Sequence, residues 1–201
     1  MKKITIILAA IVAVSGAAIT VSCNSTIETK NKVENSEPVF TQEQVMHGEY
    51  LVKIMGCDDC HSPKVFGPNG PEPDLNRRLS GHPAEVKIPA ADTNALKSWM
   101  LFSPDLTAYV GPWGVSYSAN LTSDETGIGR WKLEQFKKAI REGKSKGLDS
   151  NRPLLPPMPW TQYRNLTDDD LRDIFAFLKS TKPVKNLVPQ PVSPNELNVV
   201  N

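Results

Sequence analysis

The sequence predicts an all-α domain, because three segments combine an apolar stripe at helical spacing with signals for a helix start and a helix stop. These segments begin near Thr41, Lys132 and Thr167. A long interval, residues 62–119, separates the first helix from the central one and holds eight of the chain's 17 prolines. We expect this interval to form a Pro/Gly-rich, loop-rich insertion beside the helices, with one short helix or strand at residues 95–102.

The first helix has a well-marked start. Thr41 is a favoured N-cap residue and Gln44 follows three positions later, which is the capping-box pattern. Phe40 precedes the cap, where its side chain can pack against Val45. Gly56 is suited to ending the helix, because glycine readily adopts the left-handed conformation of a C-terminal cap. The helix therefore delivers the chain directly to the cysteine motif that follows it.

The other two helices form the later part of the domain. The central one, Lys132 to Glu142, has an apolar face and is closed by Gly143. The last one has Thr167 as its N-cap, aspartates in its first turn and lysines near its end, a distribution that complements the helix dipole. Pro183 stops it. Its buried face is predicted to contain Leu171, Ile174, Phe175, Phe177 and Leu178.

The C-x-x-C-H motif that begins at Cys57 is typical of covalent haem c attachment. Cys57 and Cys60 can add across the two vinyl groups of one porphyrin, while the imidazole of His61 reaches the iron from the same side. The motif occurs once, so one haem is expected. Zinc binding and thiol–disulfide chemistry are the alternatives, but zinc needs two further ligands and only two histidines, His47 and His82, remain to supply them.

The opposite face of the iron needs a second ligand, and Met158 is the leading candidate. It lies in Pro153–Trp160, a proline-rich loop that leads into the last helix. Because prolines restrict the backbone, this loop can hold a thioether against the iron at a small cost in conformational entropy. Met100 and His82 are alternative ligands, and a plain buried methionine in a rigid turn is the structural alternative for Met158 itself. The remaining candidates lie on the helix that leads into the motif and are poorly placed: Met46, Met55 and His47.

Residues 1–22 resemble a lipoprotein-type signal peptide, with two lysines, an apolar run and small residues before Cys23. Thr20 departs from this pattern, since a larger aliphatic residue is usual there. The alternatives are an ordinary cleaved signal with an incidental thiol, or an uncleaved anchor. We expect Cys23 to be lipidated, which would hold an exported protein on the periplasmic side of a bacterial membrane.

The remaining chain divides by composition. Residues 23–38 are polar and predict a flexible tether, residues 39–184 form the domain, and residues 185–201 form a C-terminal tail. The chain carries 23 basic and 22 acidic residues, a balance that gives no indication of a nucleic-acid partner. No acid–base pair, nucleophile elbow or phosphate loop is recognisable in the sequence, so we expect no catalytic activity of its own.

Several motifs taken together resemble class I cytochrome c: the attachment motif, the P-P-M-P-W loop and the final amphipathic helix, in that order. Further segments are similar to the monohaem modules of bacterial alcohol and aldehyde dehydrogenase cytochrome c subunits. The resemblance covers about Phe40 to Val184, with the insertion at 62–119 as one long interruption. The segments are N-L-T-S-D from Asn120, T-G-I-G-R-W from Thr126, R-E-G from Arg141 and L-T-D-D-D-L from Leu166.

This resemblance implies a membrane-tethered carrier of single electrons between respiratory or dehydrogenase partners, such as a dehydrogenase or a terminal oxidase. Cys57 and Cys60 match the thioether positions, His61 matches the proximal iron ligand and Met158 the distal one. One alternative is a haem subunit fixed in a dehydrogenase complex. Another is a haem enzyme or gas sensor in which the second axial site of the iron stays open.

The resemblance implies further roles for single residues, while the insertion at 62–119 departs from the family pattern. The carbonyl of Pro63 can accept the N–H of the haem-binding imidazole, or Pro63 can be a turn residue only. The insertion is either an elaboration packed beside the haem or a docking surface for a partner. Candidate donors to the haem propionates, each with ordinary packing as its alternative, are Arg130, Trp131, Trp160 and Tyr163.

Overall fold

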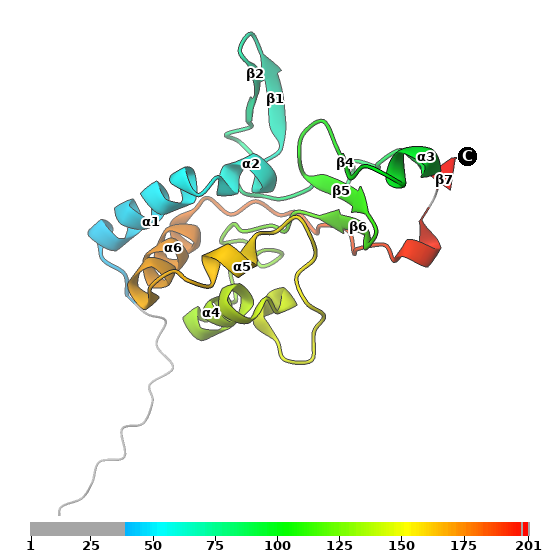
Figure 1. The fold of residues 1–201 in the computed structure, drawn as a ribbon. Coiled ribbons are helices and arrows are strands. Elements are labelled where there is room, and N and C mark those ends of the chain that lie inside the picture. Colours follow the sequence, from blue (N-terminus) through cyan, green and yellow to red (C-terminus); the bar gives the residue numbers. More distant parts are fainter. Residues whose placement is uncertain (1–38, 198, 201) are drawn as a thin grey trace, which may run out of the picture. The chain divides into compact units, whose positions relative to one another are not determined.

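A computed structural model describes residues 39–197 and 199–200 of the chain (Figure 1). The signal peptide, the lipidated Cys23 and the tether, all predicted within residues 1–38, lie outside the described residues. In the part of the chain that is described, no helix is both long enough and apolar enough to cross a membrane.

Helix α1 (Gln42–Ile54) begins as predicted. The Thr41 hydroxyl accepts a hydrogen bond from the Gln44 N–H at 3.2 Å, and the Gln44 side chain accepts one from the Thr41 N–H at 3.0 Å, which confirms the capping box. Beyond the helix, Gly56 adopts a φ of +69°, a conformation that costs glycine little. The chain then enters the five-residue helix α2 (Cys57–His61), which contains the attachment motif.

Helices α4 (Leu133–Glu142) and α6 (Asp168–Ser180) correspond to the other two predicted helices. Gly143 closes α4 with a φ of +63°, and a Cβ at this position would lie 2.5 Å from the ring of Trp160. Thr167 caps α6, and its hydroxyl accepts a hydrogen bond from the third residue of the helix. Both ends predicted from local signals are therefore formed by the predicted residues.

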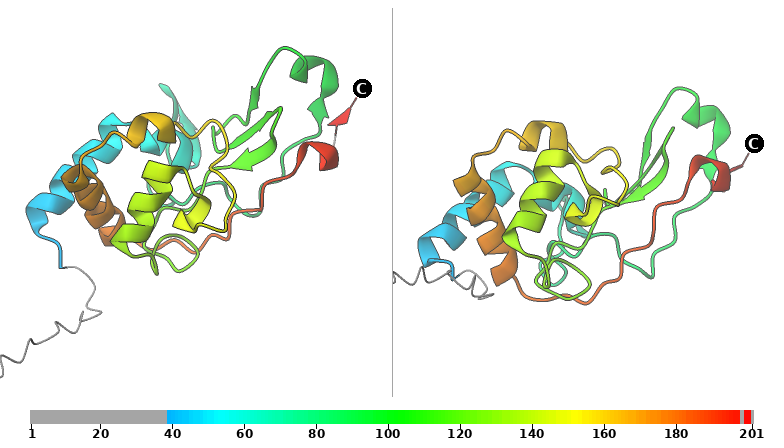
Figure 2. Two further views of the ribbon diagram at one scale, coloured as in Figure 1. Left: turned by 60° about the horizontal axis from the view of Figure 1, so that its bottom comes forward. Right: turned by 90° about the horizontal axis from the view of Figure 1, so that it is seen from below.

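Helices α1 and α6 pack side by side, as the different views agree (Figures 1 and 2). Gly48 allows the close approach, because a Cβ there would lie only 1.9 Å from the carbonyl oxygen of Asp173. His47 Nδ1 lies 2.9 Å from the Asp173 carboxylate and adds a polar contact to the crossing.

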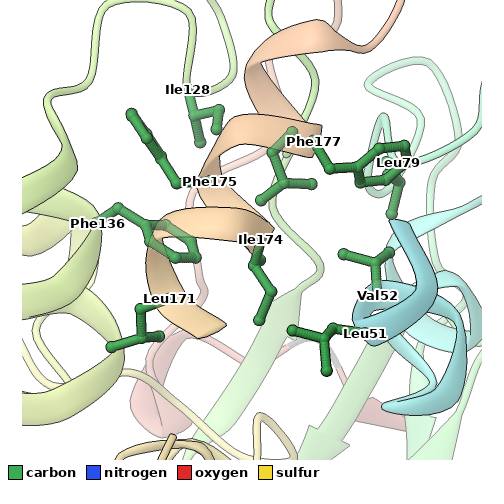
Figure 3. Close-up of a cluster of buried hydrophobic side chains, with 10 residues drawn as sticks. Leu51, Val52, Leu79, Ile128, Phe136, Leu171, Ile174, Phe175 and Phe177 are labelled. Carbon is green, nitrogen blue, oxygen red and sulfur yellow. The ribbon is translucent and has the colours of Figure 1, made fainter. Parts of the chain in front are cut away.

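The main core lies between α1, α4 and α6 (Figure 3). Phe175 is fully buried, and its ring centroid lies 6.0 Å from that of Phe40 and 5.5 Å from that of Phe136. Leu79 and Ile128, which belong to loops, complete the core. The predicted apolar face of α6 is confirmed, since every residue of it is buried.

The all-α prediction is wrong in one respect, because short strands occur within residues 62–119 and near the C-terminus. They form a β1–β2 hairpin, a three-stranded antiparallel sheet in the order β4-β5-β6, and a parallel β3–β7 pair. Strands of two to four residues are too short to produce a readable alternation in the sequence. In chain order they are β1 (Lys64–Gly67), β2 (Gly70–Pro73), β3 (Ala91–Asp92), β4 (Leu101–Phe102), β5 (Ala108–Gly111), β6 (Gly114–Tyr117) and β7 (Val199–Val200).

The β5–β6 hairpin has two different faces. Tyr109 is opposite Ser116 and Val110 is opposite Val115 in the register. Val110 and Val115 pack with Ala91 in a second, smaller apolar cluster. Because neighbouring residues of a strand point to opposite faces, Tyr109 and Ser116 face the other way, toward the site described below.

The C-terminal segment contacts β6, since the backbones of Val115 and Val192 exchange hydrogen bonds of 2.9 and 3.1 Å.

Four further short helices occur in the described part of the chain. Helix α3 and strand β4 both lie in or beside the interval predicted to hold one short helix or strand. The short helices are α3 (Thr93–Leu96), η1 (Ser145–Gly147), α5 (Trp160–Tyr163) and η2 (Pro194–Glu196).

Candidate functional site

A cavity of about 650 Å³ opens beside α2 and is large enough for a cofactor. All four predicted haem-binding residues line it: Cys57 and Cys60, His61, and Met158 from the loop before α5. The other walls include parts of α1, α4, α6, β5, β6 and the C-terminal segment. Six core residues also line the cavity and make much of its surface apolar: Val52, Ile128, Phe136, Leu171, Ile174 and Leu178.

The two cysteines of α2 are free thiols. Burial raises the pKa of the Cys57 thiol to about 12, and the neighbouring charge of Asp58 adds to the effect. A thiol in this state is protonated at neutral pH, unlike the low-pKa thiolate of a redox dithiol. In addition, the described residues contain no group of three or more His, Cys, Asp and Glu side chains that could hold a metal ion. The raised pKa of Cys57 counts against the dithiol alternative.

His61 has a fixed orientation. Its Nδ1 lies 2.8 Å from the carbonyl oxygen of Ala119. A carbonyl only accepts hydrogen bonds, so Nδ1 carries the proton and Nε2 keeps its lone pair for a metal. Burial lowers the pKa of the imidazole, which favours this neutral form.

The acceptor for the imidazole differs from the one expected. The carbonyl oxygen of Pro63 instead accepts a hydrogen bond from the Asp74 N–H at 2.8 Å. Pro63 lies directly before β1, and the orienting contact of the imidazole comes from Ala119, 58 positions along the chain from His61. Sequence spacing carries no signal for such a distant contact.

Lys64, the first residue of β1, caps the attachment helix. Its ammonium donates hydrogen bonds to the carbonyl oxygens of Asp58, Asp59 and Ser62 at 3.0, 2.9 and 2.5 Å. Burial lowers the pKa of Lys64, although nearby carboxylates oppose this. A cation at the C-terminus of a helix satisfies carbonyls that have no partner within the helix.

Met158 is half-buried and belongs to a loop whose preceding residues are anchored by two hydrogen bonds. The Leu154 N–H donates to the Gly143 carbonyl at 2.6 Å, and the Ser116 hydroxyl donates to the Pro156 carbonyl at 2.6 Å. The Pro156–Pro157 peptide bond is cis. The loop is thus fixed to α4 and to β6 while Met158 lines the cavity.

The alternative iron ligands are placed less well. Met100 is 56% exposed and does not line the cavity. His82 is fully buried, but both its ring nitrogens are already engaged, Nδ1 with the Thr107 hydroxyl at 2.8 Å and Nε2 with the Val86 carbonyl at 3.0 Å. Met55 lines the cavity from the end of α1, immediately before the attachment motif.

The expected propionate donors lie in different surroundings. Trp131 and Tyr163 line the cavity, and the Tyr163 hydroxyl donates to the Met55 carbonyl at 2.7 Å. Trp160 packs against α4 at Gly143. Arg130 is exposed and pairs with a surface glutamate at 2.6 Å, outside the cavity lining.

Two cations that sequence reasoning missed line the cavity, Lys146 and Arg152. Although the Arg152 side chain is largely exposed, partial burial lowers its pKa, and its positive charge favours a neighbouring anion. Both follow α4 and lie in or beside η1, in a stretch whose sequence has no recognisable binding motif. This edge of the cavity is chemically suited to the carboxylates of a porphyrin.

Two other walls of the cavity were not predicted from the sequence. Tyr109, Ser116 and Tyr117 line the cavity from the β5–β6 hairpin, which belongs to the insertion. Residues 187–191 line it from the C-terminal segment. With thiols, an oriented imidazole, a thioether, apolar walls and a cationic edge in one cavity, the residues present fit a covalently attached haem.

Comparisons with known proteins agree with this chemistry, although no family model matches the chain. The gluconate 2-dehydrogenase cytochrome c subunit of Pantoea cypripedii is 30% identical over 142 residues, which cover 70% of this chain and 24% of that protein. The cytochrome c subunit of the quinone-type alcohol dehydrogenase of Gluconobacter oxydans is 43% identical over 146 residues, 70% of this chain and 22% of that protein.

The chain is homologous to cytochrome c subunits of bacterial dehydrogenases. A further relative, the fructose dehydrogenase cytochrome subunit of Gluconobacter japonicus, is 41% identical over 80 residues, 38% of this chain and 16% of that protein. This cytochrome c homologue spans about a quarter or less of the length of these relatives. The resemblance predicted from the motifs is confirmed, since these relatives are named as cytochrome subunits of dehydrogenases.

Proposed function

We propose that this cytochrome c homologue is a monohaem, electron-transferring subunit of a dehydrogenase complex. Cys57 and Cys60 bind the porphyrin, and His61 and Met158 are the axial ligands of its iron. The observation that best supports this assignment is that the attachment motif and Met158, far apart in sequence, line one largely apolar cavity.

Haem c, when bound, supplies a one-electron couple. The hydrogen bond from His61 Nδ1 to Ala119 leaves Nε2 free, so His61 would bind the iron through Nε2, and the anchored loop would supply the Met158 thioether. His/Met ligation gives a higher reduction potential than two nitrogen ligands. An iron with both axial positions filled has no site for a small molecule, which favours electron transfer over gas sensing.

The axial ligands are tested by spectroscopy of the purified full chain. We expect one covalently bound haem per chain and, in the ferric state, the weak near-infrared band of a thioether–iron bond. Met158→Ala should lose this band and become high-spin, whereas Met100→Ala, at an exposed position outside the cavity, should keep it. A high-spin ferric spectrum of the unaltered chain would rule out Met158 as a ligand.

The partner is tested by isolation of the protein from solubilised membranes. Because the relatives are named as subunits of dehydrogenases, we expect a catalytic subunit to co-purify and its substrate to reduce the haem. A monomer that exchanges electrons directly with a terminal oxidase would contradict the subunit assignment.

The proposal includes a lipid anchor at Cys23 and a periplasmic location, supported by the signal-like pattern of residues 1–22. We expect Cys23→Ser to move the protein from the membrane fraction to the soluble periplasmic fraction with its haem intact. Intact-mass measurement should show loss of the acyl chains. Unchanged membrane attachment of the variant would contradict lipidation.

A further inference from the structure

Asp58 lies between the two attachment cysteines, and its carboxylate is not a free surface charge. Its side chain is only 14% exposed. Burial by itself raises the pKa of this carboxyl, but hydrogen bonds from Arg78 and Ser62 outweigh that effect and leave the pKa below its ordinary value. Asp58 therefore places a negative charge, fixed by hydrogen bonds, directly beside the attachment cysteines.

Arg78 makes the main contact with this carboxylate. Its Nε lies 3.0 and 3.2 Å from the two carboxylate oxygens, and its Nη2 donates to Oδ2 at 2.8 Å. On its other side, Nη1 donates to Glu49 of α1 at 3.0 Å. The guanidinium carbon also lies 5.3 Å from the ring centroid of Phe177 in α6. Arg78 thus connects α2 with α1 and α6.

The backbone next to Arg78 holds the rest of the motif. The Leu79 N–H donates to the Ser62 hydroxyl oxygen at 2.8 Å, and that hydroxyl donates to Asp58 at 2.8 Å. The Gly81 N–H donates to the His61 carbonyl at 2.7 Å. One short segment of the insertion therefore contacts α2 at its beginning and at its end.

We propose that Arg78 is a positioning residue for the haem-attachment helix, where it fixes Asp58 and compensates the negative charge of that carboxylate beside the iron. This inference rests on haem attachment at the motif, as proposed above. A buried ion pair contributes little net stability, but a bidentate guanidinium–carboxylate contact fixes direction as well as distance. Without Arg78, the carboxylate would lose its main compensating charge, favour the more positive ferric state and lower the reduction potential.

The test measures midpoint potentials of the full-chain holoprotein in a charge cycle. Arg78→Gln should lower the potential, Asp58→Asn should raise it, and the double variant should return close to the unaltered protein. At a fixed ambient potential, each single change should alter the ferric-to-ferrous ratio several-fold. Arg78→Lys keeps the charge but loses the bidentate contact, so its potential should stay near the original while its ferric electron paramagnetic resonance spectrum shifts.

Arg77→Gln is the matched control. Arg77 is the preceding residue and pairs with Asp74 at 3.0 Å and Glu85 at 3.3 Å, away from the motif, so its loss should leave the potential unchanged. If Arg78→Gln does not fold, the midpoint potential of Asp58→Asn and the potential and spectrum of Arg78→Lys still test the proposal. Equal effects of Arg77→Gln and Arg78→Gln, or loss of stability alone with unchanged potential and spectrum, would overturn the positioning role. An unaltered chain that binds no haem would instead refute the proposed function.

Discussion

Gly48 decides how closely α1 and α6 approach each other. Its backbone is helical, so alanine would normally favour the helix by about 1 kcal/mol. Here, however, a Cβ would lie 1.9 Å from a backbone carbonyl oxygen that cannot move without moving α6. Because the clash involves backbone, the packing penalty exceeds the gain in helix propensity.

We therefore expect Gly48→Ala to lower the free energy of unfolding by about 2 kcal/mol, measured by chemical denaturation. Gly67→Ala is the control, since a Cβ there meets only one atom, at 4.0 Å. Equal stability of the two variants would contradict the close helix contact.

Asp105 gives the insertion a dependence on pH. Burial opposes its ionisation, but hydrogen bonds from Ser103 at 2.6 Å and Thr107 at 2.7 Å outweigh burial and lower its pKa. A carboxyl whose pKa is lower in the folded state stabilises the fold above its unfolded pKa, about 3.9, and this contribution is lost as the pH falls through the folded pKa.

Asp105→Asn should consequently lose less stability than the unaltered protein between pH 6 and about pH 3. Denaturation midpoints across this range measure the difference. Glu72→Gln, on the exposed strand β2, serves as the control and should keep the original acid dependence. An unchanged slope in Asp105→Asn would show that the carboxylate has no such role.

At the scale of elements, α6 depends on its N-terminal cap. The Thr167 hydroxyl accepts from the Asp170 N–H at 3.1 Å and donates to the Asp170 carboxylate at 2.7 Å. Since α6 supplies much of the core and part of the cavity wall, fraying at this end would loosen both.

Thr167→Ala should cost about 1 kcal/mol of folding free energy, the usual value of a lost N-cap. Thermal unfolding of the holoprotein measures it, with Thr161→Ala at an exposed position of α5 as the comparison. If both substitutions are neutral, the cap does not limit the stability of the helix.

At the scale of the whole domain, Asn186 connects the C-terminal segment to residues 80–84 through side-chain hydrogen bonds. Its amide group donates to the carbonyls of Ser80 at 2.7 Å and His82 at 2.9 Å, and its side-chain oxygen accepts from the Ala84 N–H at 3.0 Å. The residues that follow it, 187–191, form one wall of the cavity.

Asn186→Ala should destabilise the fold by about 3 kcal/mol, because it leaves several buried backbone groups without partners. Hydrogen exchange should also accelerate at residues 80–84. Asn151→Ala, which removes a single hydrogen bond to the Ser145 carbonyl, is a milder control. Exchange that stays slow in Asn186→Ala would contradict this connecting role.

The sequence by itself determined the local features of this protein. The N-caps Thr41 and Thr167, the stop at Gly143, the buried face of α6 and the thiols and imidazole of the C-x-x-C-H motif depend on neighbours within one or two helical turns. The sequence also predicts Met158 as a candidate iron ligand, because a rigid proline-rich loop is recognisable from neighbouring residues alone.

Only the tertiary structure decided which distant groups complete the site. The partner of the His61 imidazole is Ala119, and the partner of Asp58 is Arg78, 20 positions away. The β5–β6 wall, the C-terminal wall and Arg152 likewise come from segments whose sequence has no binding signature. Such contacts form when the folded core brings remote backbone together, so their geometry depends on the whole chain rather than on the spacing of nearby residues.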